Sequence, residues 1–257
     1  MNANSENSQS KVLRLFRFRA INEYLWQELE MAEIFACKPQ LLNDPFDCQV
    51  DPISALSRAL EKTEDPERAI VLNHIKASFL ASDPRANDVG LSCFSLSMEN
   101  QLMWTHYADS HRGVCLCYDI PEAHFRTHYP TTNQDHYLVG IADIKYGNDS
   151  YFSWLLEGDF HNPVPSEPTT NAAAQTLVSK AACWAYEQEV RIIMNRPGFF
   201  RLDPGFLTQV TFGLRTPKRQ KELIAQMAKR SNPSVKLAVT RRSKEADFGI
   251  LFDEIGG

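Results

Sequence analysis

The chain has 257 residues, of which 43% are hydrophobic and 23% are charged, an ordinary composition for a globular protein with a sizeable core. Its net charge of −5 argues against a general nucleic-acid binder. No segment has the roughly 18 consecutive apolar residues of a membrane span, and the polar start MNANSENSQS lacks the apolar part of a signal peptide. We therefore expect a cytoplasmic protein without membrane contact, while secretion without a cleaved signal stays open.

The first third of the chain predicts a strand followed by helices. Residues 1–10 are expected to be a disordered tail, and residues 11–20 alternate apolar and basic side chains, which indicates a first strand. Apolar residues at helical spacing predict a helix within residues 21–36. Two Asp-Pro pairs then give start signals for two more helices, which form a helical insert near residues 51–82.

The rest of the chain predicts alternating strands and helices. Strands are expected at residues 88–97, 113–120, 138–146, 184–193, 209–214, 235–240 and 248–255. Helices are expected at residues 98–110, with Ser97 as cap, and at residues 175–183 and 217–230. The Pro-rich segment 162–174 is expected to be a mobile loop. Because no internal repeat is present, residues 11–257 are predicted to form a single α+β domain.

Cysteine spacing and charge distribution give two weaker indications. None of the six cysteines forms a C-x-x-C pair, so we expect buried, reduced thiols and no bound metal. Residues 211–257 hold ten Lys/Arg and five Asp/Glu, a local charge of +5. This basic cluster is either a solvated helix face or a surface for an anionic partner. It contains Arg215, Lys218, Arg219, Lys221, Lys229, Arg230, Arg241, Arg242 and Lys244.

Paired carboxylates occur in residues 184–193, WAYEQEVRII. As a strand, this segment would place Glu187, Glu189 and Arg191 on one face, with the two carboxylates roughly 7 Å apart. Like charges at this distance raise one pKa, which suits acid–base chemistry, and Arg191 would moderate the effect. An exposed charged strand face gives the same pattern, so the pair needs companions elsewhere in the chain.

Two other stretches supply candidate companions. Arg17 and Arg19 lie in the first strand and face away from its phenylalanines, and arginine is suited to bidentate phosphate binding. Ser92 and Ser95 lie at the end of a strand before a helix. Hydroxyls there either orient a carboxylate or a ribose, or satisfy the helix N-terminus.

In this order, the arginine, serine and E-x-E motifs resemble those of the Arg–Ser–Glu class of ADP-ribosyltransferases. The resemblance implies NAD as substrate and a split, mainly antiparallel β-sheet core. It implies that Arg19 or Arg17 holds the dinucleotide, and that Ser95 or Ser92 orients the second glutamate and the nicotinamide ribose. The chain departs from the class in reading Ser-Cys-Phe-Ser rather than Ser-Thr-Ser, and its first arginine is not followed by glycine.

The resemblance also assigns the two glutamates. Glu189 would bind the ribose 2′-hydroxyl and stabilise an oxocarbenium-like cation as nicotinamide leaves, and Glu187 would position or deprotonate the acceptor. The aromatic rings of Phe94 and Tyr186 would either stack on nicotinamide or adenine or simply pack. His106 is either a hydrogen-bonded structural histidine or a site residue.

A resemblance over more of the chain leads to a different family. The segments NDPFD, CFS, MWTHYADSHRGVCLCYD and WAYEQEVRI, in this order and spacing, are similar to an uncharacterised bacterial domain-of-unknown-function family. That family brings no established activity. Asp44 and Asp47 of NDPFD are expected to cap the helix at residue 51 or to stiffen a turn. The central motif shows no H-E-x-x-H spacing, and the chain has no G-x-S-x-G elbow.

Two functions from different classes follow. The first is an enzyme that cleaves the nicotinamide glycosidic bond of NAD and transfers ADP-ribose to a protein or nucleic-acid acceptor, or to water. The alternative is a non-catalytic module of a bacterial toxin or phage-defence system that binds a nucleotide or a partner protein. In that alternative, Glu187, Glu189 and Arg191 form an ion-pair network, and the basic cluster is the partner surface. A phosphodiesterase or nuclease is a third reading, for which no metal-ligand set is recognisable.

Overall fold

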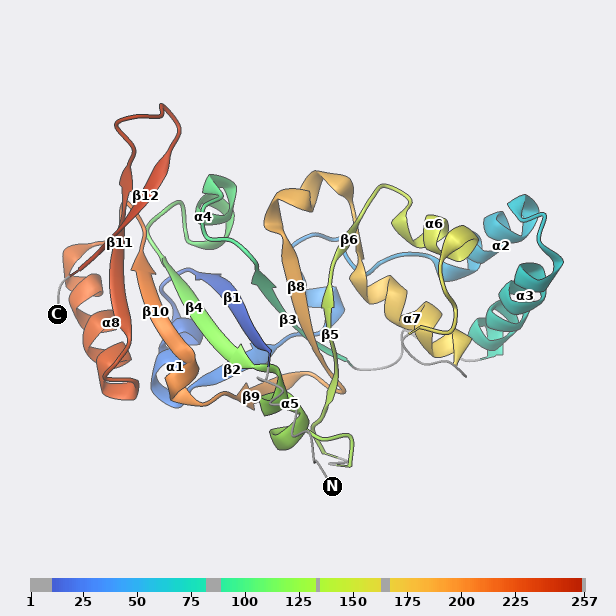
Figure 1. The fold of residues 1–257 in the computed structure, drawn as a ribbon, viewed down its shortest axis with the longest axis horizontal. Coiled ribbons are helices and arrows are strands. Elements are labelled where there is room, and N and C mark those ends of the chain that lie inside the picture. Colours follow the sequence, from blue (N-terminus) through green and yellow to red (C-terminus); the bar gives the residue numbers. More distant parts are fainter. Residues whose placement is uncertain (1–10, 82–88, 133–134, 163–166, 256–257) are drawn as a thin grey trace, which may run out of the picture. The chain divides into compact units, whose positions relative to one another are not determined.

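A computed structural model describes residues 11–81, 89–132, 135–162 and 167–255. The expected tail at residues 1–10 and the end of the expected helical insert lie outside the described residues. The chain packs as two units, each built from segments that are far apart in the sequence (Figure 1). Unit 1 comprises residues 1–35, 94–139 and 199–257, and unit 2 comprises residues 36–93 and 140–198.

Unit 1 is built on a mainly antiparallel sheet. Its strands are β1 (Val12–Arg19), β4 (Val114–Pro121), β10 (Leu207–Phe212), β11 (Lys236–Arg242) and β12 (Ile250–Glu254), in the order β12-β11-β10-β4-β1. The end of β3 (Gly90–Ser95) continues this order, with Phe16 opposite Ser95. Only β10 and β11 are parallel among these pairs, because helix α8 (Lys218–Ser231) connects them as the predicted β-α-β unit.

Three further helices and a small strand pair complete unit 1. The helices are α1 (Glu23–Met31), α4 (Gln101–Tyr107) and α5 (Glu122–His128). Strand β2 (Glu33–Ala36) pairs with β9 (Gly198–Arg201), and η4 (Pro204–Phe206) is a short 3₁₀ turn. The predicted helix over residues 21–36 was wrong at its end, because α1 stops at Met31 and residues 33–36 form β2. Strands of four residues give too short an alternation to detect, so β9 was not predicted either. Asn100 caps α4, so the prediction that Ser97 is the cap was wrong.

Among the described residues, unit 2 combines five strands, two of them only two residues long, with four α-helices. In its part of the sheet, β8 (Glu189–Met194) lies between the beginning of β3 and β5 (Leu138–Asp143). The helices are α2 (Pro52–Lys62), α3 (Pro66–Ala81), α6 (Ser150–Glu157) and α7 (Pro168–Val178). A parallel pair joins β6 (Lys145–Tyr146) to β7 (Ser179–Lys180), and η1 (Pro39–Leu41) and η3 (Ala182–Glu187) are 3₁₀ helices.

The helices of unit 2 bury a core of their own. Leu56, Leu72, Ile75 and Leu155 are fully buried in it, which accounts for the packing of α2, α3 and α6. Asp51 caps α2 by accepting the N–H groups of Ile53 and Ser54, as the Asp-Pro signal predicted. Residues 168–174 belong to α7 and not to a mobile loop, because Pro168 stands at a helix start, where a missing N–H costs nothing.

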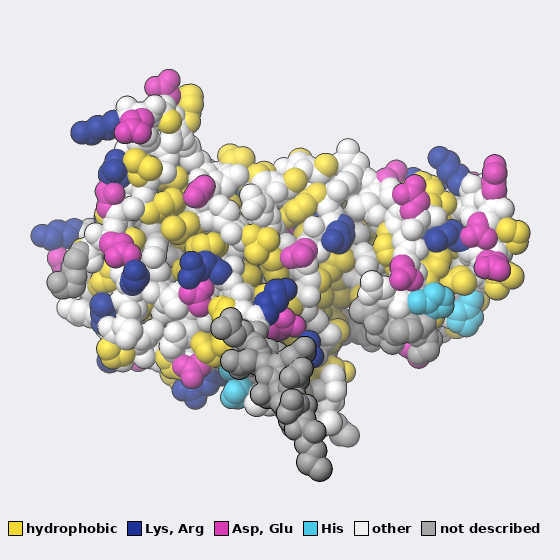
Figure 2. Space-filling view, viewed as in Figure 1, with side chains coloured by type: hydrophobic (Ala, Val, Ile, Leu, Met, Phe, Trp, Pro, Cys, Tyr) yellow, Lys and Arg dark blue, Asp and Glu magenta, His cyan; other side chains and the backbone are white. Residues whose placement is uncertain are grey.

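The predicted α+β class with mainly antiparallel strands is confirmed for the described residues. Among those residues, no helix combines the length and the apolar character needed to cross a membrane. Figure 2 shows Lys and Arg side chains interspersed with Asp and Glu on the visible face of unit 1. Two residues of the basic cluster are paired with acids, Arg230 with Glu30 and Arg241 with Asp253. Lys236, from the same stretch of the chain, pairs with Glu254.

Candidate functional site

Five charged side chains meet inside unit 2, and we refer to them as the charge cluster. They are Asp47, Lys180, Glu187, Glu189 and Arg191, and none of their side chains is more than 4% exposed. They come from the loop before α2, from β7, from the end of η3 and from β8. Charges are buried to this extent only when they are paired and hydrogen-bonded.

Lys180 is the centre of the charge cluster. Its Nζ donates to Glu187 Oε2 at 2.5 Å and to Glu189 Oε2 at 2.8 Å, and it lies 3.2 Å from Asp47 Oδ2. Sequence reasoning missed this lysine. It lies in the two-residue strand β7, which gives no periodic signal, and 133 positions separate it from Asp47.

Arg191 forms the second positive centre. Its Nε donates to Glu189 Oε1 and its Nη2 to Asp47 Oδ2, each at 2.6 Å. Its Nη1 donates to the carbonyl oxygen of Leu177 at 2.6 Å and to the sulfur of Cys48 at 2.9 Å. With these partners the guanidinium is fully buried. Asp47 therefore belongs to the cluster, and the prediction that it caps a helix or stiffens a turn was wrong.

The backbone around the two glutamates explains how both reach the same lysine. Residues 182–187 form the 3₁₀ helix η3, and Gln188 has the left-handed dihedrals φ 46° and ψ 51°. Strand β8 begins only at Glu189, so the prediction of one strand over residues 184–193 was wrong in its first half. The reversal at Gln188 turns both carboxylates to Lys180, and the hydroxyl of Tyr146 accepts the N–H of Glu189 at 2.7 Å.

The electrostatics of the cluster keep its groups ionised. Burial acts to raise the pKa of Glu189, but the charges of Arg191 and Lys180 and their hydrogen bonds lower it from 4.5 to about 2. Burial acts to lower the pKa of Lys180, but Glu189, Asp47 and Glu187 raise it well above its ordinary value. Three carboxylates and two cations give a formal charge of −1, so the cluster favours a further positive charge nearby.

Two buried thiols border the cluster. Burial raises the pKa of Cys48 to about 12, and burial also raises the pKa of Cys93 well above its ordinary value. The Cys93 thiol is hydrogen-bonded to Glu189. Both cysteines are therefore neutral thiols at physiological pH. The prediction of buried cysteines holds for Cys48 but is wrong for Cys183, which is exposed.

The two predicted serines lie on opposite faces of β3. Side chains alternate along a strand, so Ser95 shares a face with Cys93, while Ser92 shares the other with Phe94. Ser95 Oγ donates to the carbonyl of Ser97 at 2.9 Å, and Ser92 is buried. Cys93, which contacts Glu189, therefore shares its face of β3 with Ser95 and not with Ser92.

The predicted arginines lie in unit 1 and bind a partner that sequence reasoning missed. Glu28 of α1 accepts from Arg19 Nε at 2.8 Å and forms an ion pair with Arg17, whose Nε lies 2.9 Å from Glu28 Oε1. The Arg17 guanidinium also lies 5.0 Å from the centre of the Phe94 ring. Since Phe16 is opposite Ser95, alternation in β1 puts both arginines on the face away from Ser95.

The remaining predicted residues are dispersed. His106 is exposed on α4, beside Tyr107, and Trp104 of the same helix is fully buried. Tyr186 is half-buried in η3 and packs against Trp184. In the described ranges, no group of three or more His, Cys, Asp or Glu side chains is arranged to hold a metal ion.

Comparison with known proteins gives one family. A family described as "Protein of unknown function (DUF2971)" matches residues 103–192, about a third of the chain. The matched part contains Lys180, Glu187, Glu189 and Arg191, four of the five members of the charge cluster. The match supports a relation of the chain to an uncharacterised domain family. Searches of curated proteins and of solved structures found no match.

Proposed function

We propose that the chain cleaves the nicotinamide glycosidic bond of NAD in the manner of the ADP-ribosyltransferases that its motifs resemble. The observation that carries the proposal is the contact of Glu189 with β3. Strand β8, which begins with Glu189, is the neighbour of β3 in unit 2, and the Cys93 thiol of β3 is hydrogen-bonded to this glutamate. The glutamate strand thus lies beside the serine strand, as a shared site requires.

The charge cluster supports this chemistry in a second way. When nicotinamide leaves, positive charge develops on the ribose, and preorganised negative charge stabilises that transition state. Glu189 remains a carboxylate at neutral pH because its pKa is about 2, so it acts by its charge and not as a proton donor. Arg191 and Lys180 fix its orientation, and their bonds limit its side-chain motion. As the bond breaks, the positive charge moves from the nicotinamide ring to the ribose, and the net charge of −1 favours the ribosyl cation that results.

The proposal gives each motif residue a role. Glu189 faces the ribose and Glu187 acts on the acceptor, while the resemblance assigns the orientation of the glycoside to Ser95. Arg17 and Arg19 hold Glu28 within unit 1, because Arg19 donates to its carboxylate and Arg17 forms an ion pair with it. This differs from the role in dinucleotide binding that the resemblance implied for them.

The test is release of nicotinamide from NAD by the purified chain, with a cell lysate added as a source of acceptors. We expect release by the wild type and a loss of about 10²-fold or more in Glu189→Gln. Glu187→Gln is the matched control, since its carboxylate binds the same Lys180 Nζ. In that variant, release to water should persist while transfer to the acceptor falls. No release by the wild type would refute the proposal, and equal release by Glu189→Gln would remove that residue from the mechanism.

One observation favours the alternative of a non-catalytic binding module. Both oxygens of Glu189 already accept from basic groups: Oε1 from Arg191, and Oε2 from Lys180 and from Arg191. A carboxylate held in this way also suits an ion-pair network that fixes β7, β8 and the loop before α2. Binding of NAD without any release of nicotinamide would support this alternative.

A further inference from the structure

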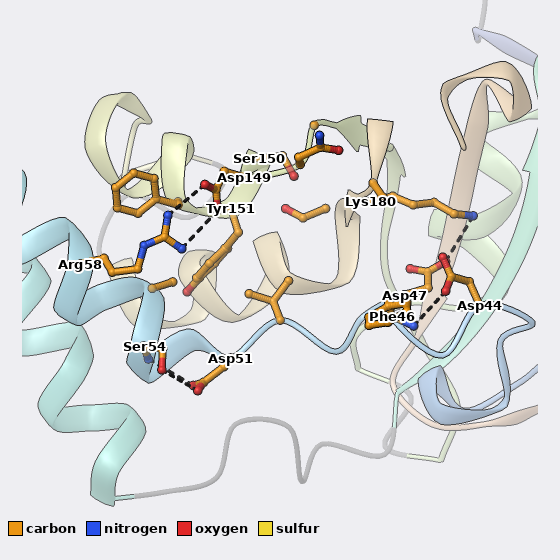
Figure 3. A pocket seen from close by; sticks show the side chains of 17 residues that line it. Asp44, Phe46, Asp47, Asp51, Ser54, Arg58, Asp149, Ser150, Tyr151 and Lys180 are labelled. Atoms are coloured by element: carbon orange, nitrogen blue, oxygen red, sulfur yellow. Dashed lines mark hydrogen bonds and ion pairs between the residues drawn. The ribbon is translucent and has the colours of Figure 1, made fainter. Parts of the chain in front are cut away.

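Unit 2 contains a cavity with a volume of about 420 Å³ next to the charge cluster. Small-molecule sites usually measure about 300–1,000 Å³, so the cavity is large enough for a metabolite. Figure 3 shows Lys180 and Asp47 at one end, and Arg58 and Asp149 with Tyr151 beside them at the other. The walls come from the loop before α2, from α2 itself, from the start of α6 and from β7.

The charge of the lining selects the sign of the ligand. Four aspartates line the cavity against one lysine and one arginine, a formal charge of −2. The aspartates are Asp44, Asp47, Asp51 and Asp149. An anion would be repelled by this surplus, whereas a cation would reduce it. In the described residues, no cluster is arranged to hold a metal ion, so the charge points to an organic cation.

Two buried hydroxyls give independent evidence for a ligand. Tyr151 and Ser179 both line the cavity, and their side chains are only 2% and 5% exposed. Within the described part of the chain, neither Tyr151 Oη nor Ser179 Oγ has a hydrogen-bond partner. A buried polar group without a partner is costly and needs an explanation. Burial raises the pKa of Tyr151, so its hydroxyl is neutral and is able to accept a hydrogen bond.

We propose that this cavity binds a small organic cation with primary amines, of the diamine or polyamine class. An ammonium group has three N–H donors, which Tyr151 Oη and Ser179 Oγ accept while the aspartates balance the charge. The rings of Phe46, Tyr151 and Phe152 also line the cavity, and they suit the methylene spacers between amines and add cation–π attraction. Lys180 and Asp47 belong to both sites, but binding at Tyr151 and Ser179 does not require NAD cleavage, so either proposal can fail without the other.

The test is calorimetric titration of the full chain with spermidine, at low and at moderate ionic strength. We expect binding that weakens with salt, since screening reduces the attraction of the aspartates. Tyr151→Phe and Ser179→Ala should each weaken binding about tenfold or more. Thr169→Val is the matched control, because Thr169 Oγ1 is another buried hydroxyl of unit 2 without a partner among the described residues, and Thr169 does not line this cavity.

Thermal unfolding without spermidine separates a ligand group from a folding group. Tyr151→Phe removes a buried hydroxyl that has no partner, so its Tm should equal or exceed that of the wild type. Loss of affinity together with an undiminished Tm supports the site. The proposal is overturned if spermidine does not bind, or if Tyr151→Phe binds it as tightly as the wild type. Equal binding of 1,8-octanediol, which lacks the charge, would also overturn it.

Discussion

Replacement of Lys180 by methionine should strongly destabilise the chain, because the side chain keeps its length and loses its charge. Lys180 is buried among three carboxylates at 2.5 to 3.2 Å, and only Arg191 would remain to balance them in the cluster. Breaking a buried ion pair by removing one partner costs about 3–5 kcal/mol. At roughly 2–4 °C per kcal/mol for a chain of this size, the Tm should fall by about 6–20 °C.

The loss of stability in Lys180→Met should also depend on pH. Without Lys180 the cluster has one more uncompensated negative charge, so the pKa values of its carboxylates rise in the folded state. Protons taken up by the folded state as the pH falls from 7 to 5 then relieve the repulsion, so the loss of stability should be smaller at pH 5 than at pH 7. Urea unfolding followed by tryptophan fluorescence at both pH values measures the difference.

An exposed pair in the same unit supplies the control. Asp149 and Arg58 form an ion pair whose side chains are 59% and 50% exposed, so Asp149→Asn should cost at most about 1 kcal/mol. The reasoning is refuted if Lys180→Met costs as little as this control at pH 7. A large loss that is the same at pH 5 would show that packing, and not charge, is what the lysine contributes.

Three further predictions concern other buried groups. The folded-state pKa of Glu189, about 2 against an ordinary 4.5, contributes about 3 kcal/mol of stability above pH 4.5. This contribution is lost as the pH falls through 2, and acid-series urea unfolding of Glu189→Gln should show a flatter profile. Glu28→Gln should lower the free energy of unfolding by about 3 kcal/mol, because two arginines lose their shared carboxylate; an unchanged value would contradict this. Iodoacetamide at pH 8 should modify exposed Cys183 long before Cys48, whose pKa burial raises to about 12, and mass spectrometry would show the order.

Local patterns predicted much of the fold. The alternation in residues 11–20 gave β1, and the Asp-Pro signals gave α2 and α3 with Asp51 as an observed cap. The β-α-β unit near the end of the chain was predicted from strand and helix periodicity alone. Segments of two to four residues, such as β7 and β2, were missed, because a periodic pattern needs more residues than they contain.

The candidate site was predicted only in part. The E-x-E motif drew attention to Glu187, Glu189 and Arg191, and these three do lie together in unit 2. The predicted reason for their proximity was wrong, however. The prediction assumed that residues 184–193 form one strand, in which alternation puts both carboxylates on the same face. The structure unites them through the left-handed Gln188, whose conformation no periodic pattern indicates.

The sequence by itself determined the α+β class, the main strands and helices, and the segment in which charged residues gather. Tertiary structure decided what those residues contact: Lys180 and Asp47 bind Glu189 and Arg191 in unit 2, and Glu28 binds both arginines of β1. The physical reason is the difference in sequence separation between the interactions involved. Secondary structure follows from neighbours along the chain, whereas burial of a charge depends on partners that only the folded chain brings within hydrogen-bond distance.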